Sequence, residues 1–98
     1  MALLDDVKTQ LRITISDLDG EVQDLIDAAQ ADLQLSGVRA DKVEDVTDPL
    51  IKRVVVLYCK ANFGYDNPDA DRFQRSYDLL KVHLTLSTDY VEVDDDEA

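Results

Sequence analysis

The segment Asn67–Asp78 places oxygen-bearing side chains at the spacing of a calcium-binding loop. Its first, third, fifth and twelfth positions hold Asn67, Asp69, Asp71 and Asp78. A calcium loop also needs glycine at its sixth position for a sharp turn and usually a bidentate glutamate at its twelfth, where this segment has Arg72 and Asp78. Pro68, at the second position, suits the start of a helix better than a coordinating loop. The sequence therefore favours a capped helix start over a metal site.

The other reactive side chains are too few to form a recognisable catalytic or zinc-binding set. Cys59 and His83 are the single cysteine and the single histidine, and no nucleophile motif accompanies the histidine. Cys59 follows an apolar run, which predicts a buried thiol rather than a reactive one. The three glycines are far apart, so no phosphate-binding loop exists. We expect no enzymatic activity, no cofactor and no metal.

The elements that carry these residues are predicted to be helices, in an all-α fold of about four helices. Residues 2–12 have apolar side chains at intervals of three and four, which predicts a short amphipathic helix. A second helix, capped by Ser16 or Asp17, carries one apolar stripe and ends at Gly37. The stripe consists of Val22, Leu25, Ile26, Ala29 and Leu33.

Two Asx-Pro dipeptides predict the starts of the third and fourth helices. Asp48 and Asn67 are each held outside the helical region by the following proline and can cap the helix that follows. The helix after Pro49 is apolar on most sides and ends at Gly64, which predicts a central position in the bundle. The helix after Pro68 carries an apolar stripe of Phe73, Tyr77, Leu80 and Leu84.

Two segments remain outside these helices. The connection from Gly37 to Thr47 is longer than a compact helical protein usually needs, so it is either a plain loop or a surface with a role of its own. The final residues, 91–98, carry five acids and no base, which predicts a flexible acidic tail after a helical domain of residues 1–90. Alternatively, Tyr90, Val91 and Val93 order against a partner chain.

The charge of the chain limits the classes of partner. The sequence has 22 acidic and 10 basic residues, a net charge of −12, and residues 1–90 alone carry −7. Such a surface repels phosphate, which disfavours binding to DNA or to an anionic membrane. The longest apolar run, Val54 to Cys59, is far too short to span a bilayer, so we expect a soluble protein made in the cytoplasm.

Three segments in a fixed order resemble one known family. They are LLDDVKTQLRI from Leu3, EVQDLIDAAQADL from Glu21, and DPLIKRVVVLYCKANFGYDNPDADRFQRSYDLLKVHL from Asp48. Together they are similar to the small head-tail connector proteins of tailed bacteriophages, which genomes often label as phage DNA-packaging proteins. The resemblance extends to about Tyr90, and the acidic end from Glu92 lies outside it.

The resemblance implies a helical protein of the virion that assembles as a ring of about a dozen subunits beneath the portal protein. Such a ring extends the DNA channel and meets a tail-completion or head-closure protein. DNA is expected to pass through without specific binding. We hypothesise that acids line the lumen and repel the passing duplex; placement of the acids outside the ring would contradict this idea.

A ring needs two different complementary patches on each subunit. The candidates are the first helix, the long connection and the end of the chain, because each has more surface than a self-contained bundle requires. Their residues are Leu3, Leu4, Val7, Leu11, Arg39, Lys42, Tyr90, Val91 and Val93.

Two other functions remain open. The first is a DNA-packaging regulator resembling a small terminase subunit, which would need a basic recognition helix; the third helix has Lys52, Arg53 and Lys60 among apolar residues. The second is an acidic inhibitor that mimics DNA and occupies the site of a basic protein through surface carboxylates.

Overall fold

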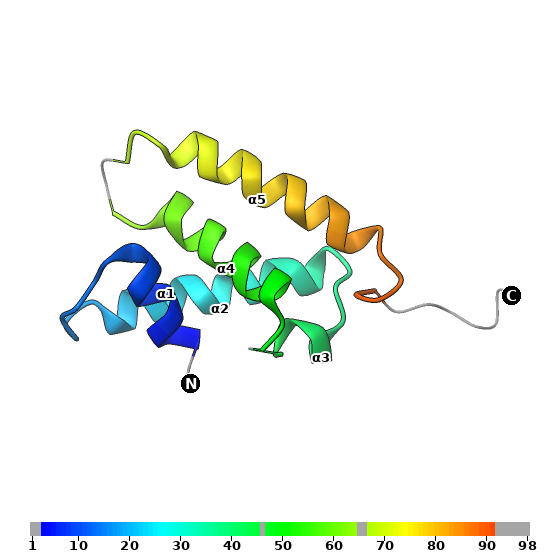
Figure 1. Ribbon diagram of the computed structural model, residues 1–98, viewed down its shortest axis with the longest axis horizontal. Coiled ribbons are helices and arrows are strands. Elements are labelled where there is room, and N and C mark those ends of the chain that lie inside the picture. Colours follow the sequence, from blue (N-terminus) through cyan, green and yellow to red (C-terminus); the bar gives the residue numbers. More distant parts are fainter. Residues whose placement is uncertain (1–2, 46, 65–66, 92–98) are drawn as a thin grey trace, which may run out of the picture.

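The protein is a bundle of α-helices, as predicted. The computed structural model describes residues 3–45, 47–64 and 67–91, which form five helices and no β-strand (Figure 1). The helices are α1 (Leu3–Leu11), α2 (Asp19–Leu35), α3 (Ala40–Val43), α4 (Pro49–Asn62) and α5 (Ala70–Thr85). The five helices include one more than the sequence predicted, because α3 is a single turn within the connection from Gly37 to Thr47.

Helix α4 is the central element of the bundle. It packs against α1, α2 and α5, and six of its fourteen residues are buried. Figure 1 shows α4 between α5 on one side and the α1–α2 pair on the other. An amphipathic helix needs one covered face, whereas α4 is covered on most sides, which explains its nearly continuous apolar sequence. Its buried residues are Ile51, Val54, Val55, Val56, Leu57 and Cys59.

The start of α4 follows the sequence prediction closely. Asp48 adopts an extended backbone conformation, and its Oδ1 accepts hydrogen bonds from the backbone N–H groups of Leu50 (2.9 Å) and Ile51 (3.4 Å). Pro49 occupies the first helical position, where a missing N–H group costs nothing. These local contacts fix where the central helix begins.

The start of α5 differs from that of α4, although both follow an Asx-Pro pair. The Asn67 Oδ1 atom accepts from the backbone N–H of Asp69 (3.1 Å), which makes an Asx turn, and α5 begins only at Ala70. The Asn67 amide group donates to the backbone oxygen of Lys60 in α4 (2.6 Å). Asn67 is therefore not the helix cap that the sequence suggested, because its side chain is used for the turn and for a tie to α4.

Helix α2 also begins differently from the prediction. Its N-cap position is Leu18, with no side-chain cap, so neither Ser16 nor Asp17 caps this helix. Asp19, in the first turn, instead pairs with Lys8 of α1 at 2.6 Å. A carboxylate there complements the positive end of the helix dipole while it joins two helices.

The ends of α1 and α2 share one geometry. The N–H of Ile13 donates to the Lys8 oxygen (2.9 Å), and that of Val38 donates to the Leu33 oxygen (3.0 Å), as in a Schellman motif. The left-handed position is Gly37 (φ +113°) after α2 but Arg12 (φ +62°) after α1. The predicted glycine stop of α2 is confirmed, and α1 uses a non-glycine residue for the same turn.

The connection from Gly37 to Thr47 is not a plain loop. It contains α3, and its Val38 and Val43 are buried in the same core as α2 and α4. Gln30 of α2 donates to the Val43 backbone oxygen (3.4 Å). The length of this segment is therefore explained largely by a turn of helix that covers one end of the bundle.

Candidate interaction surfaces

The acids that resemble a calcium loop have structural roles. Asp69 lies at the N-cap position of α5 and pairs with Arg72 at 3.5 Å, and Asp78 accepts a hydrogen bond from Gln74 (3.0 Å). Asp71 lies in the first turn, where it complements the helix dipole. In the part of the chain that the structure describes, no group of three His, Cys, Asp or Glu side chains is placed to hold a metal ion.

The two single reactive residues lie in opposite environments. Cys59 is fully buried in α4, and this burial raises the pKa of its thiol to about 12. His83 is exposed on α5. The prediction that the thiol is buried is confirmed.

The predicted interface residues of α1 divide into two classes. Leu3 and Val7 are buried in the core of their own subunit, whereas Leu4 and Leu11 are partly exposed and pack against its edge. Val7 is 0% exposed, so its side chain is not part of any surface of this conformation. A role of α1 between subunits stays a prediction, and only Leu4, Leu11 and the outer polar residues of the helix are accessible for it.

Four predicted interface residues from the connection and the chain end lie together. The backbone N–H of Arg39 donates to the Tyr90 oxygen (2.7 Å), Val91 forms an isolated antiparallel bridge with Val38, and the Lys42 ammonium lies 5.5 Å from the centre of the Tyr90 ring. Arg39 itself pairs with Asp41 at 2.6 Å. Tyr90 and Val91 are thus ordered against their own chain; Val93 lies outside the described residues.

Asp48 joins this cluster to the central helix. While its Oδ1 caps α4, its Oδ2 accepts a hydrogen bond from the Tyr90 hydroxyl (2.9 Å). Burial and the neighbouring Asp48 carboxylate together raise the pKa of Tyr90 to about 12. One carboxylate therefore holds both the start of α4 and the end of the described chain.

A second carboxylate joins α2 to α5. Asp32 Oδ2 accepts from the hydroxyl of the buried Tyr77 (2.6 Å) and from the Lys81 ammonium (2.9 Å). These two donors, the tyrosine first, lower the pKa of Asp32, whereas burial and the same bond raise that of Tyr77. The Tyr77 ring also meets Tyr58 of α4 edge to face, with centroids 5.2 Å apart. Sequence spacing had predicted that Tyr77 faces the core but had not identified its partner.

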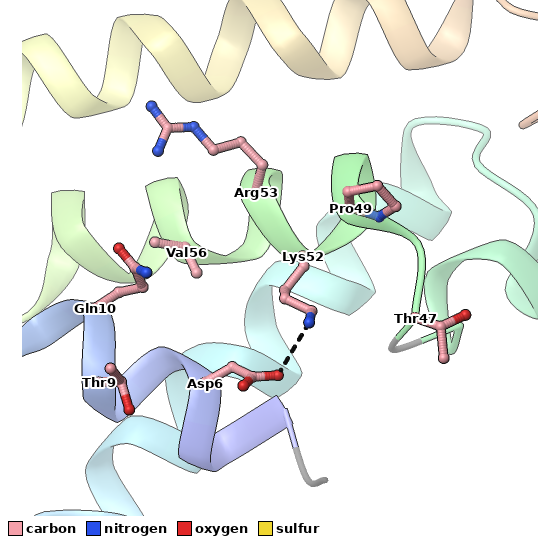
Figure 2. Close-up of a pocket in the computed structure, with 8 residues that line it drawn as sticks. All are labelled: Asp6, Thr9, Gln10, Thr47, Pro49, Lys52, Arg53 and Val56. Carbon is pink, nitrogen blue, oxygen red and sulfur yellow. Dashed lines mark ion pairs between the residues drawn. The ribbon is translucent and has the colours of Figure 1, made fainter.

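An open groove of about 380 Å³ lies between α1, α4 and the segment before α4 (Figure 2). Lys52 pairs across it with Asp6 at 3.3 Å, and the nearby Arg53 is exposed. Thr9, Gln10, Thr47, Pro49 and Val56 complete its lining. The groove is open to solvent and the ion pair lies across it, so it suits a contact with a partner surface better than an enclosed ligand.

Most of the large exposed apolar side chains lie elsewhere, on α2 and α5, and Ile15 before α2 and Leu50 in the first turn of α4 are also exposed. Leu79 and Val82 on α5 and Leu86 at its C-cap position are 62%, 49% and 77% exposed, and Leu35 at the end of α2 is 87% exposed. The sequence had offered a signal for the first three, because they form a second apolar set between the buried ones at intervals of three and four. This set was not recognised as an interaction surface.

Comparison with known proteins decides the family of the chain. A family model described as phage connector protein matches residues 3–91, which is nearly the whole chain. The chain belongs to the phage connector family. This match confirms the resemblance found in the sequence and indicates a structural role in a phage particle. Comparisons with curated proteins and with solved structures find no match.

The ionisable residues in the described part of this phage connector are spread over several contacts. Its ionisable residues with shifted pKa values act in caps, ion pairs and helix contacts rather than converging on one cavity. Among the described residues, no helix is long and apolar enough to cross a membrane. Two features of this connector have no role within the single subunit. They are its exposed apolar residues and its net negative charge.

Proposed function

We propose that this phage connector assembles as a ring of about a dozen subunits beneath the portal protein, extends the DNA channel, and joins the DNA-filled head to the tail through a tail-completion or head-closure protein. The role is structural rather than catalytic. The observation that carries the proposal is the family match over residues 3–91. The family match supports a connecting role, and the proposal adds the ring, the contact with the portal protein and the DNA channel.

The exposed apolar residues support an assembled state. Four side chains of leucine or valine on α2 and α5 remain about half exposed or more in the single subunit. Scattered exposed hydrophobic residues are ordinary, but three on one face of one helix form a patch of the kind that marks a protein contact. A subunit of a ring covers such a patch, whereas an isolated monomer leaves it in water.

The charge supports a channel through which DNA slides. With a net charge of −12, the chain repels the phosphate backbone, whereas a lumen of lysines and arginines would bind it with a strong dependence on salt. The connector is therefore expected to leave the electrophoretic mobility of duplex DNA unchanged even at low salt. A retarded complex would favour the packaging-regulator function instead.

The test is a deletion of the reading frame from the phage or prophage that encodes it, followed by electron microscopy of the lysate. Filled or leaking heads beside unattached tails are the expected result, and a copy of the gene supplied in trans should restore complete virions. Empty proheads with uncut DNA would contradict the proposal in favour of a packaging regulator. Normal virions would contradict it in favour of an acidic inhibitor, which should form a salt-sensitive complex with a basic protein.

A further inference from the structure

Helix α5 presents a stripe of residues that the fold of one subunit leaves uncovered. The stripe lies on the side of the helix opposite to the buried Tyr77 and Leu84, and its members recur at intervals of four, three and four. Its first residue is basic and the others are apolar. The α5 stripe consists of Arg75, Leu79, Val82 and Leu86. Arg75 makes no ion pair with any residue that the structure describes.

Helix α2 presents a stripe with the same spacing. Its members are all exposed and lie opposite to the buried Val22, Ile26, Ala29 and Leu33. The first residue is acidic, the next two are small, and the last is the most exposed large hydrophobic residue described. The α2 stripe consists of Asp24, Ala28, Ala31 and Leu35. Asp24 likewise makes no ion pair within the described chain.

The two stripes complement each other position by position when the helices lie parallel. The pairs are Asp24 with Arg75, Ala28 with Leu79, Ala31 with Val82, and Leu35 with Leu86. Intervals of three and four on both helices are those of a coiled-coil seam. The small alanines leave room for the larger side chains opposite them, which lets the helix axes approach to about 8–10 Å. One turn earlier, Glu21 and Arg72 repeat the charge pair.

Pairing of a stripe with a copy of itself is less favourable. Two parallel α5 stripes would place Arg75 beside Arg75, and two parallel α2 stripes would place Asp24 beside Asp24. Antiparallel copies would place each charge opposite a leucine, which leaves the charge partly desolvated without a partner. Charge complementarity therefore selects α5 against α2.

The arrangement of the subunit allows this pairing to repeat around an axis. Helices α2 and α5 run in the same direction on the two sides of α4 (Figure 1). Asp32 near the end of α2 bonds to Tyr77 and Lys81 of α5, and the residues that follow the two helices, Val38 and Val91, form a bridge. Rotation about an axis along the helices preserves their direction, so α5 of one subunit can meet α2 of the next in parallel.

We propose that the α5 stripe of each subunit packs in parallel against the α2 stripe of a second copy of this chain, forming the head-to-tail contact that closes the ring. This inference rests on the ring in the proposed function and adds which two surfaces make it. The contact is heterologous, because the two patches are different, and such contacts generate rings when the rotation closes.

Disulfide cross-linking tests the contact directly. The double variant Ala31→Cys/Val82→Cys should form a ladder of covalent oligomers under mild oxidation, because each subunit offers one thiol to each neighbour. Each single variant should stay monomeric on a denaturing gel, and a mixture of the two singles should give dimers and nothing larger. The native Cys59 is buried with its pKa raised to about 12, so it does not interfere. Ile15→Cys/Val82→Cys, with Ile15 exposed on another part of the surface, is the matched control and should not cross-link.

A charge exchange provides a second readout without covalent bonds. Arg75→Asp and Asp24→Arg should each raise the concentration needed for half-assembly by about tenfold or more, because each places like charges together. The double variant should return this concentration toward that of the wild-type protein. Sedimentation velocity over a range of concentrations measures it.

Each contrary result has its own meaning. Cross-linking by Val82→Cys alone or Ala31→Cys alone would indicate a self-pairing stripe and overturn the inference. A wild-type protein that sediments as a ring while the double cysteine variant fails to cross-link would also overturn it, yet would leave the proposed ring intact. The ring and the inference would both be overturned if the wild-type protein sediments as a monomer at every concentration and does not assemble when purified portal protein is added.

Discussion

Two aspartate–tyrosine pairs hold distant parts of this chain together, and they differ in their surroundings. Tyr77 is buried on α5, and its hydroxyl donates to Asp32 of α2 at 2.6 Å. Tyr90 lies beyond the last helix, partly exposed, and donates to Asp48 at 2.9 Å. The first pair joins two long helices inside the bundle, whereas the second joins the end of the described chain to the start of α4.

The difference teaches that the same hydrogen bond has different consequences in different surroundings. The ring of Tyr77 fills core volume and contacts Tyr58, so most of its contribution to stability should come from packing. Tyr90 has less buried surface, and the bond of its hydroxyl to Asp48 and the contact of its ring with the Lys42 ammonium carry more of the contribution of its side chain. The four predictions that follow test this distinction.

The largest difference should appear when each tyrosine is truncated. Tyr77→Ala should lower the free energy of unfolding by about 4 kcal/mol, because it leaves a cavity in the core. Tyr90→Ala should cost only about 1–2 kcal/mol, because less apolar surface is lost. Urea unfolding followed by far-UV circular dichroism measures both. Equal losses would show that the two tyrosines are packed alike.

Loss of the Asp48 side chain should cost about 2 kcal/mol, because Asp48→Ala removes the cap of α4 together with the acceptor of the Tyr90 hydroxyl. Asp48→Ser is the matched control, since serine can still cap the helix but has no second oxygen for Tyr90. It should recover about half of the loss. If serine and alanine behave identically in urea unfolding, the helix cap contributes nothing.

Removal of one hydroxyl at a time should separate the two pairs. Tyr90→Phe and Tyr77→Phe should each cost about 1 kcal/mol. In double-mutant cycles with Asp48→Ser, Tyr90→Phe should be coupled by about 0.5–1 kcal/mol, and Tyr77→Phe should be additive. Coupling of Tyr77 to Asp48 would indicate that the two pairs act as one network through α4.

Acid should weaken the Asp32 pair, with the smallest effect of the four. The pKa of Asp32 is lowered in the folded chain, so its contribution to stability is complete above the ordinary aspartate value of 3.8 and is lost as the pH falls through the lower folded value. The difference in unfolding free energy between the wild-type protein and Asp32→Asn should therefore shrink below about pH 4. A difference that grows on acidification would mean that burial rather than its hydrogen bonds controls Asp32.

Local signals were sufficient to predict most of the helices. Asp48 and Pro49 mark the start of α4 through contacts within a few residues, and Gly37 marks the end of α2 through its left-handed conformation. Helix α3 was not predicted, because four residues are too short to show helical periodicity. Its position depends instead on the burial of Val43 against other helices.

The sequence did not predict the hydrogen bonds between residues that are far apart in the chain. Asp32 lies 45 residues before Tyr77, and Asp48 lies 42 residues before Tyr90. Nothing in the sequence around Asp32 distinguishes it from the other acids of a chain with 22 acidic residues. The Asp48-Pro49 pair indicates a helix cap but gives no sign of the bond to Tyr90. Likewise, the apolar face of α1 indicates that another surface covers this helix. Only the tertiary arrangement shows whether that surface belongs to the same subunit or to a neighbour.

The sequence indicates only one of the two surfaces in the candidate contact between subunits. Leu79, Val82 and Leu86 have helical spacing, but a second apolar set on one helix can be core or interface until the first set is seen to be buried. The complementary α2 stripe has two alanines, which are inconspicuous by composition. Their relation to α5 emerges from the parallel course of the two helices in the folded subunit (Figure 1).

The burial of Cys59 makes its reaction with a thiol reagent a probe of how often the bundle opens. A thiol that is enclosed in the central helix, with its pKa raised to about 12, reacts with a thiol reagent only after the bundle opens. The rate of its modification therefore reports how frequently a subunit opens, and it can be measured on free and on assembled protein. In the proposed ring, the neighbours of a subunit would stabilise its folded state by mass action, so the ratio of the modification rates of free and assembled protein would report how much stability each subunit gains.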